Sequence, residues 1–167
     1  MDEGVGLGCS RRGHRGGSGD RPAVRLEAKG LRVQQRLSSD SDDCFGHSYG
    51  QVQEYFRSHP CSALFRVLFE VSDRPGNMVL VAVAWVDMPD EAQASELRRL
   101  MDRDGTGNVT ELSRESGKYR DVRFTGDFYR STLDGVTVIN AAAEPTSRAA
   151  SAVDLAGRVV SAVTSEG

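Results

Sequence analysis

Residues 64–86 read LFRVLFEVSDRPGNMVLVAVAWV, and this stretch decides the fold. Its first eight residues carry Phe65, Val67, Phe69 and Val71 on one side, with Arg66 and Glu70 on the other, as in a half-buried strand. Turn-forming residues follow at 73–77, and residues 78–86 are apolar on both faces. We therefore predict an antiparallel hairpin whose second strand lies in the centre of a sheet.

Helices are predicted on both sides of this hairpin. Apolar residues at three- and four-residue steps predict a helix over 48–58, which Pro60 ends. A second helix opens at Met88-Pro89-Asp90-Glu91, where proline suits the first turn and the carboxylates face the positive end of the helix dipole. A third helix is predicted over 147–164, with small and β-branched residues on its buried side.

Short strands are predicted over 122–125, 128–133 and 136–142, with Asp134-Gly135 as a hairpin turn. The order becomes α-β-β-α-β-β-(β)-α, with hairpins in place of helical crossovers. This order is typical of the α+β class. We predict one domain over 38–167, an antiparallel sheet of four to five strands with about three helices packed on it.

Residues 1–37 are rich in glycine and arginine and lack apolar periodicity, so we predict a disordered tail. This segment has a net charge of +4 and the whole chain −3, which leaves −7 for residues 38–167. An acidic domain, and a tail without aromatic residues among its arginines, argue against a nucleic-acid partner. No apolar stretch approaches the roughly 20 residues that span a bilayer, so membrane contact would need an anchor absent from this chain.

Gly46-His47-Ser48-Tyr49-Gly50 matches the G-x-S-x-G pattern of serine hydrolases. Ser48 would be the nucleophile, and the only histidine downstream of it is His59. That family places its serine between a strand and a helix, whereas a polar loop precedes Ser48. We therefore interpret Ser48 as the N-cap of the helix over 48–58 and keep a hydrolase as an alternative.

Residues 102–110 resemble the first nine positions of an EF-hand calcium loop. The ligand positions would be filled by Asp102, Asp104, Thr106 and Asn108. The twelfth position, where a bidentate glutamate is expected, is Ser113. We interpret the segment as a loop in which Gly105 and Gly107 take positive φ, with weak calcium binding, on the order of 10⁻³ M, as the alternative.

Two of the three cysteines, Cys44 and Cys61, flank the helix over 48–58. Extended residues on both sides can fold back along the helix and bring the two within disulfide distance. Two free thiols are the first alternative. The second is a zinc site formed by Cys44, His47, His59 and Cys61, although its H-x-C arm is an unusual spacing.

The chain resembles a group of uncharacterised actinobacterial proteins over about residues 31–145. The resemblance rests on Cys44 and Cys61 around Ser48-Tyr49-Gly50-Gln51-Val52, on Val86-Asp87-Met88-Pro89-Asp90, and on Asp104-Gly105-Thr106-Gly107-Asn108-Val109. Members of that group carry one N-terminal membrane span followed by an extracytoplasmic α+β domain, and they have no assigned activity.

The resemblance implies an extracytoplasmic or membrane-associated location, and without an export signal the domain would be cytoplasmic. No acid, base and nucleophile stand together in a recognisable pattern, and no cofactor loop is evident. We therefore expect a non-catalytic binding or sensing module without a cofactor. Its partner would be a small ligand or an envelope protein.

Overall fold

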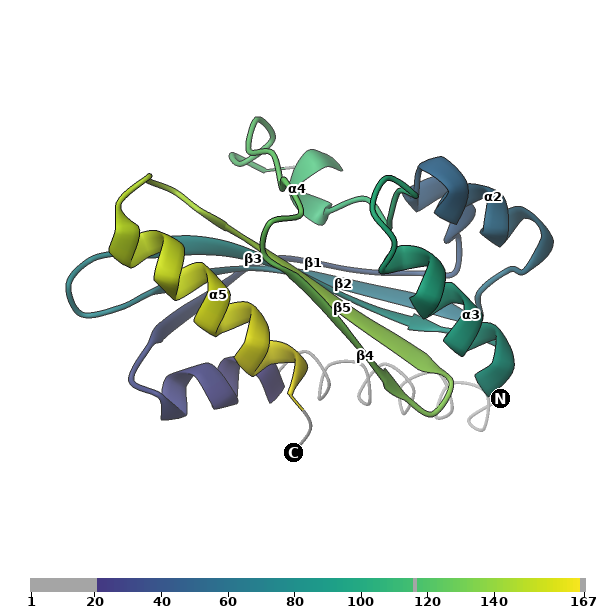
Figure 1. Ribbon diagram of the computed structural model, residues 1–167, viewed down its shortest axis with the longest axis horizontal. Coiled ribbons are helices and arrows are strands. Elements are labelled where there is room, and N and C mark those ends of the chain that lie inside the picture. Colours follow the sequence, from purple (N-terminus) through teal and green to yellow (C-terminus); the bar gives the residue numbers. More distant parts are fainter. Residues whose placement is uncertain (1–20, 116, 166–167) are drawn as a thin grey trace, which may run out of the picture.

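A computed structural model describes residues 21–115 and 117–165 of the chain. Its centre is a five-stranded antiparallel sheet in the order β1-β2-β3-β5-β4 (Figure 1). The strands are β1 (Arg32–Ser41), β2 (Ala63–Ser72), β3 (Met78–Asp87), β4 (Tyr129–Asp134) and β5 (Thr137–Pro145). The predicted α+β class and antiparallel sheet are confirmed.

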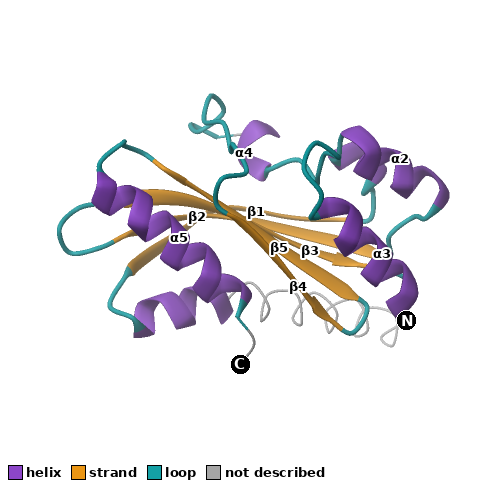
Figure 2. Ribbon diagram, viewed as in Figure 1, coloured by secondary structure: helices purple, strands orange, loops and turns teal. Residues whose placement is uncertain are grey.

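Helices lie on both sides of this sheet (Figure 2). They are a helix over residues 21–28, the 3-10 turn η1 (Phe45–His47), α2 (Gly50–Ser58), α3 (Glu91–Met101), α4 (Leu112–Glu115) and α5 (Ala150–Thr164). The order is therefore α-β-α-β-β-α-α-β-β-α. Compared with the prediction, it gains a helix and a strand at its start and the short α4.

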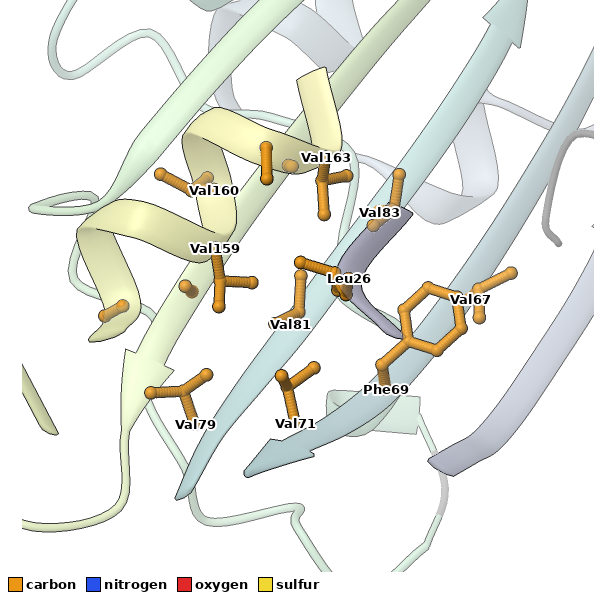
Figure 3. Close-up of a cluster of buried hydrophobic side chains, with 14 of the residues drawn as sticks. Leu26, Val67, Phe69, Val71, Val79, Val81, Val83, Val159, Val160 and Val163 are labelled. Atoms are coloured by element: carbon orange, nitrogen blue, oxygen red, sulfur yellow. The ribbon is translucent and has the colours of Figure 1, made fainter. Parts of the chain in front are cut away.

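One face of the sheet is covered by α5 and the helix over 21–28. Figure 3 shows Leu26 of that helix among the side chains of β2 and β3, with Val159, Val160 and Val163 of α5 beside them. The valines and alanines of α5 let its axis lie close to the sheet, which is why a small-residue stripe suits this position. This cluster is the larger part of the core.

The other face is covered in two parts. At one end α2 and α3 pack their apolar sides on the sheet, in a cluster that contains Val52, Phe56, Leu64, Val86 and Leu97. Nearer the other end, Tyr119, Val122 and Phe124 cover Leu68, Leu80 and Ala82. The prediction of a strand over 122–125 is therefore wrong. The alternating apolar residues of this segment belong to a loop that packs on the sheet without strand pairing.

The prediction that the second strand of the hairpin is central is confirmed, because β3 lies between β2 and β5. The prediction that β2 is half-buried is wrong. Arg66 and Glu70 on its polar side are 2% and 8% exposed. Two additions bury them: β1 pairs with β2 from outside, and the segment after α3 crosses the face on which they stand.

The prediction of a disordered tail over 1–37 is wrong for the residues from 21 onward. Residues 1–20 lie outside the described residues, but 21–28 are helical and β1 begins at Arg32. The sequence of β1, RVQQRLSSDS, lacks a hydrophobic pattern because this strand lies at the edge of the sheet. An edge strand forms backbone hydrogen bonds on one side only and leaves many side chains in water.

All three predicted helices begin later than expected, and the helix predicted over 48–58 begins at Gly50. The α3 helix begins at Glu91, and Asp90 is its N-cap, with its carboxylate accepting the Gln93 backbone N–H at 2.8 Å. The predicted carboxylate at the helix start is therefore present, and the cap satisfies one of the free amides of the first turn. The last helix begins at Ala150, three residues after the predicted start.

Within residues 21–115 and 117–165, no helix has the length and apolar character needed to cross a membrane.

Candidate functional site

A disulfide joins Cys44 and Cys61, with their Cα atoms 6.1 Å apart. Cys44 precedes η1 and Cys61 follows α2, so the flanking segments fold back along the helix as predicted. The alternative of a zinc site at Cys44, His47, His59 and Cys61 is wrong, because two sulfur atoms bonded to each other offer no thiolate to a metal. His59 stacks on Tyr55 with ring centroids 4.2 Å apart, and His47 contacts Glu115 instead.

Ser48 is buried, and its hydroxyl donates to the Cys44 carbonyl oxygen at 2.7 Å. The predicted N-cap role is wrong, since α2 begins at Gly50 and Tyr49 occupies the cap position. His59 lies at the opposite end of α2 and is the C-cap residue of that helix. The two hydrolase candidates therefore stand at the two ends of one helix.

Three of the predicted calcium ligands have other partners. Asp102 Oδ1 accepts hydrogen bonds from the hydroxyls of Tyr129 at 3.1 Å and Ser131 at 2.6 Å. The Thr106 hydroxyl donates to the Leu100 carbonyl oxygen at 2.6 Å. Asn108 Oδ1 accepts from Asn140 Nδ2 at 2.9 Å, while Asp104 is exposed.

The segment over 102–110 holds the start of α2 in place through its backbone. Tyr49 N–H donates to Asn108 O and Val52 N–H donates to Thr106 O, both at 3.0 Å. Gly105 and Gly107 have φ of 79° and 90°, which confirms the predicted positive φ. A Cβ on Gly107 would lie 2.1 Å from Tyr49 O, so this approach requires glycine.

Beyond this segment, the structure builds a polar site around Arg66 that no sequence motif indicated. Arg66 lies on β2, and its side chain is 3% exposed. Its Nη1 and Nη2 each donate to the Glu115 carboxylate at 2.9 Å, and Nη1 also donates to Thr110 O at 3.0 Å. Two parallel N–H···O bonds are the geometry in which guanidinium binds a carboxylate most strongly.

Glu115 is the last residue of α4 and also contacts a histidine. His47 Nδ1 lies 2.9 Å from Glu115 Oε2, and the side chains of His47 and Glu115 are 30% and 31% exposed. Burial opposes ionisation of Glu115, but hydrogen bonds from Arg66 and His47 outweigh it and hold the pKa of this carboxyl below its usual value. The carboxylate therefore joins a buried cation to a partly exposed imidazole.

A small cavity of about 20 Å³ lies beside Arg66, lined among others by Asn108, Asn140 and Glu111. Among the described residues, Arg66 Nε and Ser113 Oγ are buried without a hydrogen-bond partner. Burial raises the pKa of Glu111. A buried donor without a partner is uncommon in folded proteins, because the group loses its hydrogen bonds to water and gains none in return.

A different carboxylate, Glu70, is buried and binds residues of β1 and of the segment over 117–124. Arg36 Nε lies 2.9 Å from Glu70 Oε2, and the Tyr119 hydroxyl donates to the same oxygen. The hydrogen bond from Arg36 holds the pKa of Glu70 below its usual value, against the opposing effect of burial. Burial, together with this carboxylate, raises the pKa of Tyr119 to about 12. The Arg36 contact joins β1 to β2, and the Tyr119 hydrogen bond fastens the segment over 117–124 to the sheet.

Arg66 and His47 together present hydrogen-bonding nitrogens that are suited to holding a carboxylate, and in this structure they hold that of Glu115. The imidazole of His47 is oriented by Glu115, as in many acid–base catalysts. However, the hydroxyl of the adjacent Ser48 points to backbone carbonyl oxygens and is buried. Within the described ranges, no cluster of three or more histidine, cysteine, aspartate or glutamate side chains is placed to hold a metal ion.

Sequence reasoning missed this site because it placed Arg66 and Glu70 on a solvent-exposed face. The signal was present as two opposite charges within a strand otherwise made of large apolar residues. Neither partner, Glu115 nor Arg36, is close to β2 in sequence, so the pairs could not be read from local spacing. Comparison of the chain with protein-family models, curated proteins and solved structures finds no match.

Proposed function

We propose that this chain is a non-catalytic binding or sensing module that works outside the cytoplasm. Its partner would be a small ligand or an envelope protein. The observation that carries the location is the Cys44–Cys61 disulfide. Disulfides form and persist in oxidising compartments, and cytosolic thiols are generally kept reduced.

The polar site at Arg66 supports binding as the activity. The Arg66 side chain is 3% exposed, and it contacts the Glu115 carboxylate, which is partly exposed together with His47. Such a site can recognise a charged group with directional hydrogen bonds. The hydroxyl of Ser48 is not directed at a base, which favours binding over hydrolysis.

The resemblance to extracytoplasmic actinobacterial proteins points to the same compartment. It would also place the domain close to a membrane, through an N-terminal anchor of the kind those proteins carry. The resemblance names no reaction, so it supports the location and leaves the ligand to the site itself.

The location is tested by measuring intact mass after alkylation under non-reducing conditions, on protein exported to an oxidising compartment. We expect Cys44 and Cys61 to resist alkylation and to appear in one cross-linked peptide. Protein treated first with reductant is the control and should gain two alkyl groups at these positions. Free alkylation of both cysteines in the untreated protein would contradict the proposal.

The absence of hydrolase activity is tested with a serine-reactive fluorophosphonate probe, with Ser48→Ala as the control. We expect equal background labelling of both proteins, because the Ser48 hydroxyl is buried and donates to Cys44 O. Labelling that the substitution removes would establish Ser48 as a nucleophile and would favour the enzyme alternative.

A further inference from the structure

We propose that the position between Arg66 and His47, now held by the Glu115 carboxylate, is a binding site for the carboxylate of a small ligand. The ligand would take the place of Glu115, whose side chain rotates towards solvent. This inference rests on the function proposed above and names the chemistry of the ligand.

The fixed part of the site is Arg66. It projects from β2, which is paired on both sides by β1 and β3, so its position is set by the sheet. Its Nη1 and Nη2 hold two carboxylate oxygens at 2.9 Å each, and His47 Nδ1 lies 2.9 Å from one of them. These donors recognise a planar two-oxygen group, and they do not depend on which molecule supplies it.

The replaceable part of the site is Glu115. It ends a helix of four residues, and 31% of its side chain is exposed, compared with 3% for Arg66. Part of the Glu115 side chain therefore already reaches water. Rotation of one side chain would open the donors of Arg66 and His47 without any change in the sheet.

The arginine is also costly as a purely structural residue. Its Nε is buried without a partner beside the cavity of about 20 Å³, which has room for roughly one water molecule. An apolar side chain of similar volume would fill the position without the cost of desolvating a charge. A binding role accounts for a cation at this position, and the cavity is too small to hold the ligand itself.

The arrangement favours a carboxylate over a phosphate. The site provides one buried guanidinium and one imidazole, and Glu111, which carries a further carboxyl group, is among the residues that line the adjacent cavity. A phosphate dianion would add negative charge beside that carboxyl and would need further donors for its remaining oxygens. A carboxylate matches the number of donors present.

The test is an acetate titration of the Glu115→Gln variant, monitored by its thermal unfolding midpoint at constant ionic strength. The substitution removes the internal competitor and keeps the volume of the side chain. We expect a saturable rise of the midpoint with acetate in the millimolar range. Wild-type protein should respond at least tenfold more weakly, because its own carboxylate competes at a high effective concentration.

Two variants control this experiment. Arg66→Met should show no saturable response, because the fixed donors are lost. Glu54→Gln frees an arginine in the exposed Arg57–Glu54 pair, whose side chains are 63% and 62% exposed, and should respond no more than wild type. Inorganic phosphate, titrated in the same way, should give a weaker response than acetate in Glu115→Gln.

Several results would overturn the inference. They are no saturable effect of acetate on a folded Glu115→Gln variant, an equal effect in Glu54→Gln, or tighter binding of phosphate than acetate. Should Glu115→Gln not fold, the Arg66 Nε–H resonance of the wild-type protein is followed by NMR during an acetate titration that extends to well over tenfold higher concentration, because Glu115 competes in that protein. A progressive shift supports the site, and an unchanged resonance overturns it.

Failure of this test and failure of the proposed function can be told apart. If acetate has no effect but the disulfide resists alkylation, only the carboxylate site is wrong and another surface binds the partner. If the cysteines alkylate freely, the extracytoplasmic function is wrong whatever acetate does.

Discussion

At the scale of single residues, two positions depend on close contacts that their neighbours in sequence do not reveal. Gly107 lets the segment over 102–110 approach the start of α2, and Arg66 brings a charge into the interior of the sheet. Gly107 contacts Tyr49 and Arg66 contacts Glu115, and each partner lies more than forty residues away along the chain. Each can be tested with one substitution and one matched control.

Gly107→Ala should destabilise the protein strongly, because the new Cβ would meet Tyr49 O at 2.1 Å and φ is 90°. We expect a loss of at least about 2 kcal/mol in the free energy of unfolding, measured by urea denaturation. Gly105→Ala is the control, because φ is 79° but nothing lies within 4 Å. It should cost only about 1 kcal/mol; equal losses would contradict the proposed role of the close approach.

The two partners of the buried ion pair should respond unequally to substitution. Glu115→Gln leaves Arg66 buried without a counter-charge, and we expect a loss of about 2–4 kcal/mol. Arg66→Met leaves Glu115, which is 31% exposed, free to reach water, so its loss should be about 1 kcal/mol or less. Urea denaturation measures both, and a larger loss for Arg66→Met would show that the pair is itself strongly stabilising.

At the scale of elements, α2 and α4 are short helices that the rest of the fold holds in place. The disulfide and the backbone hydrogen bonds that Thr106 O and Asn108 O accept fix α2, and the Glu115 carboxylate fixes α4. Helices of this length are not stable in isolation, so these contacts decide whether they form.

Reducing the disulfide should destabilise α2 and with it the domain. For a loop with a sequence separation of 17, the loss is on the order of 3 kcal/mol. Chemical denaturation with and without reductant measures it. The double variant Cys44→Ser/Cys61→Ser should match the reduced protein and should not respond to reductant; stability independent of reductant in the wild type would contradict the structural role.

Acid should weaken the contacts of Glu115 and Glu70, because the folded-state pKa of each is lowered. The resulting stabilisation is fully present above the unfolded-state pKa of a glutamate, about 4.3, and is lost as the pH falls through the folded-state values. Unfolding free energies measured between neutral pH and about pH 3 should therefore decrease on the acid side.

The double variant Glu70→Gln/Glu115→Gln should show a flatter acid dependence than the wild type. Glu111 is the control, because its pKa is raised and its protonation relieves a cost. Glu111→Gln should keep the acid-side loss. An unchanged acid slope in the double variant would assign the loss to other carboxylates.

At the scale of the whole molecule, the sheet is buried on both faces, and the segment nearest the described N-terminus completes one of them. Leu26 is fully buried among valines of β2, β3 and α5, and the Arg25 side chain donates to carbonyl oxygens at the end of α5. The N-terminal and C-terminal helices therefore form one layer (Figure 3).

Leu26→Ala should test this layer. Removing a fully buried leucine from a packed core costs about 2–5 kcal/mol. Val24→Ala lies on the same helix but is 63% exposed, and should change the unfolding free energy by less than about 0.5 kcal/mol. Similar small effects of both substitutions would show that the helix over 21–28 is not part of the core.

Several features could be predicted from the sequence because they depend on local patterns. The hairpin of β2 and β3 followed from apolar alternation around a turn, and α2, α3 and α5 followed from three- and four-residue spacing. The positive φ of Gly105 and Gly107 followed from loop composition. The reach between Cys44 and Cys61 followed from chain geometry, although the choice of a disulfide over thiols or zinc stayed open.

The tertiary structure decided which side chains are buried and which distant residues are in contact. Polar β1 became an edge strand, residues 122–125 a covering loop, Leu26 a core residue and Ser48 a buried donor, none of which local periodicity encodes. Arg66 meets Glu115 because a distant segment crosses β2. Local spacing determines which face a side chain takes, but burial depends on which remote segment covers that face.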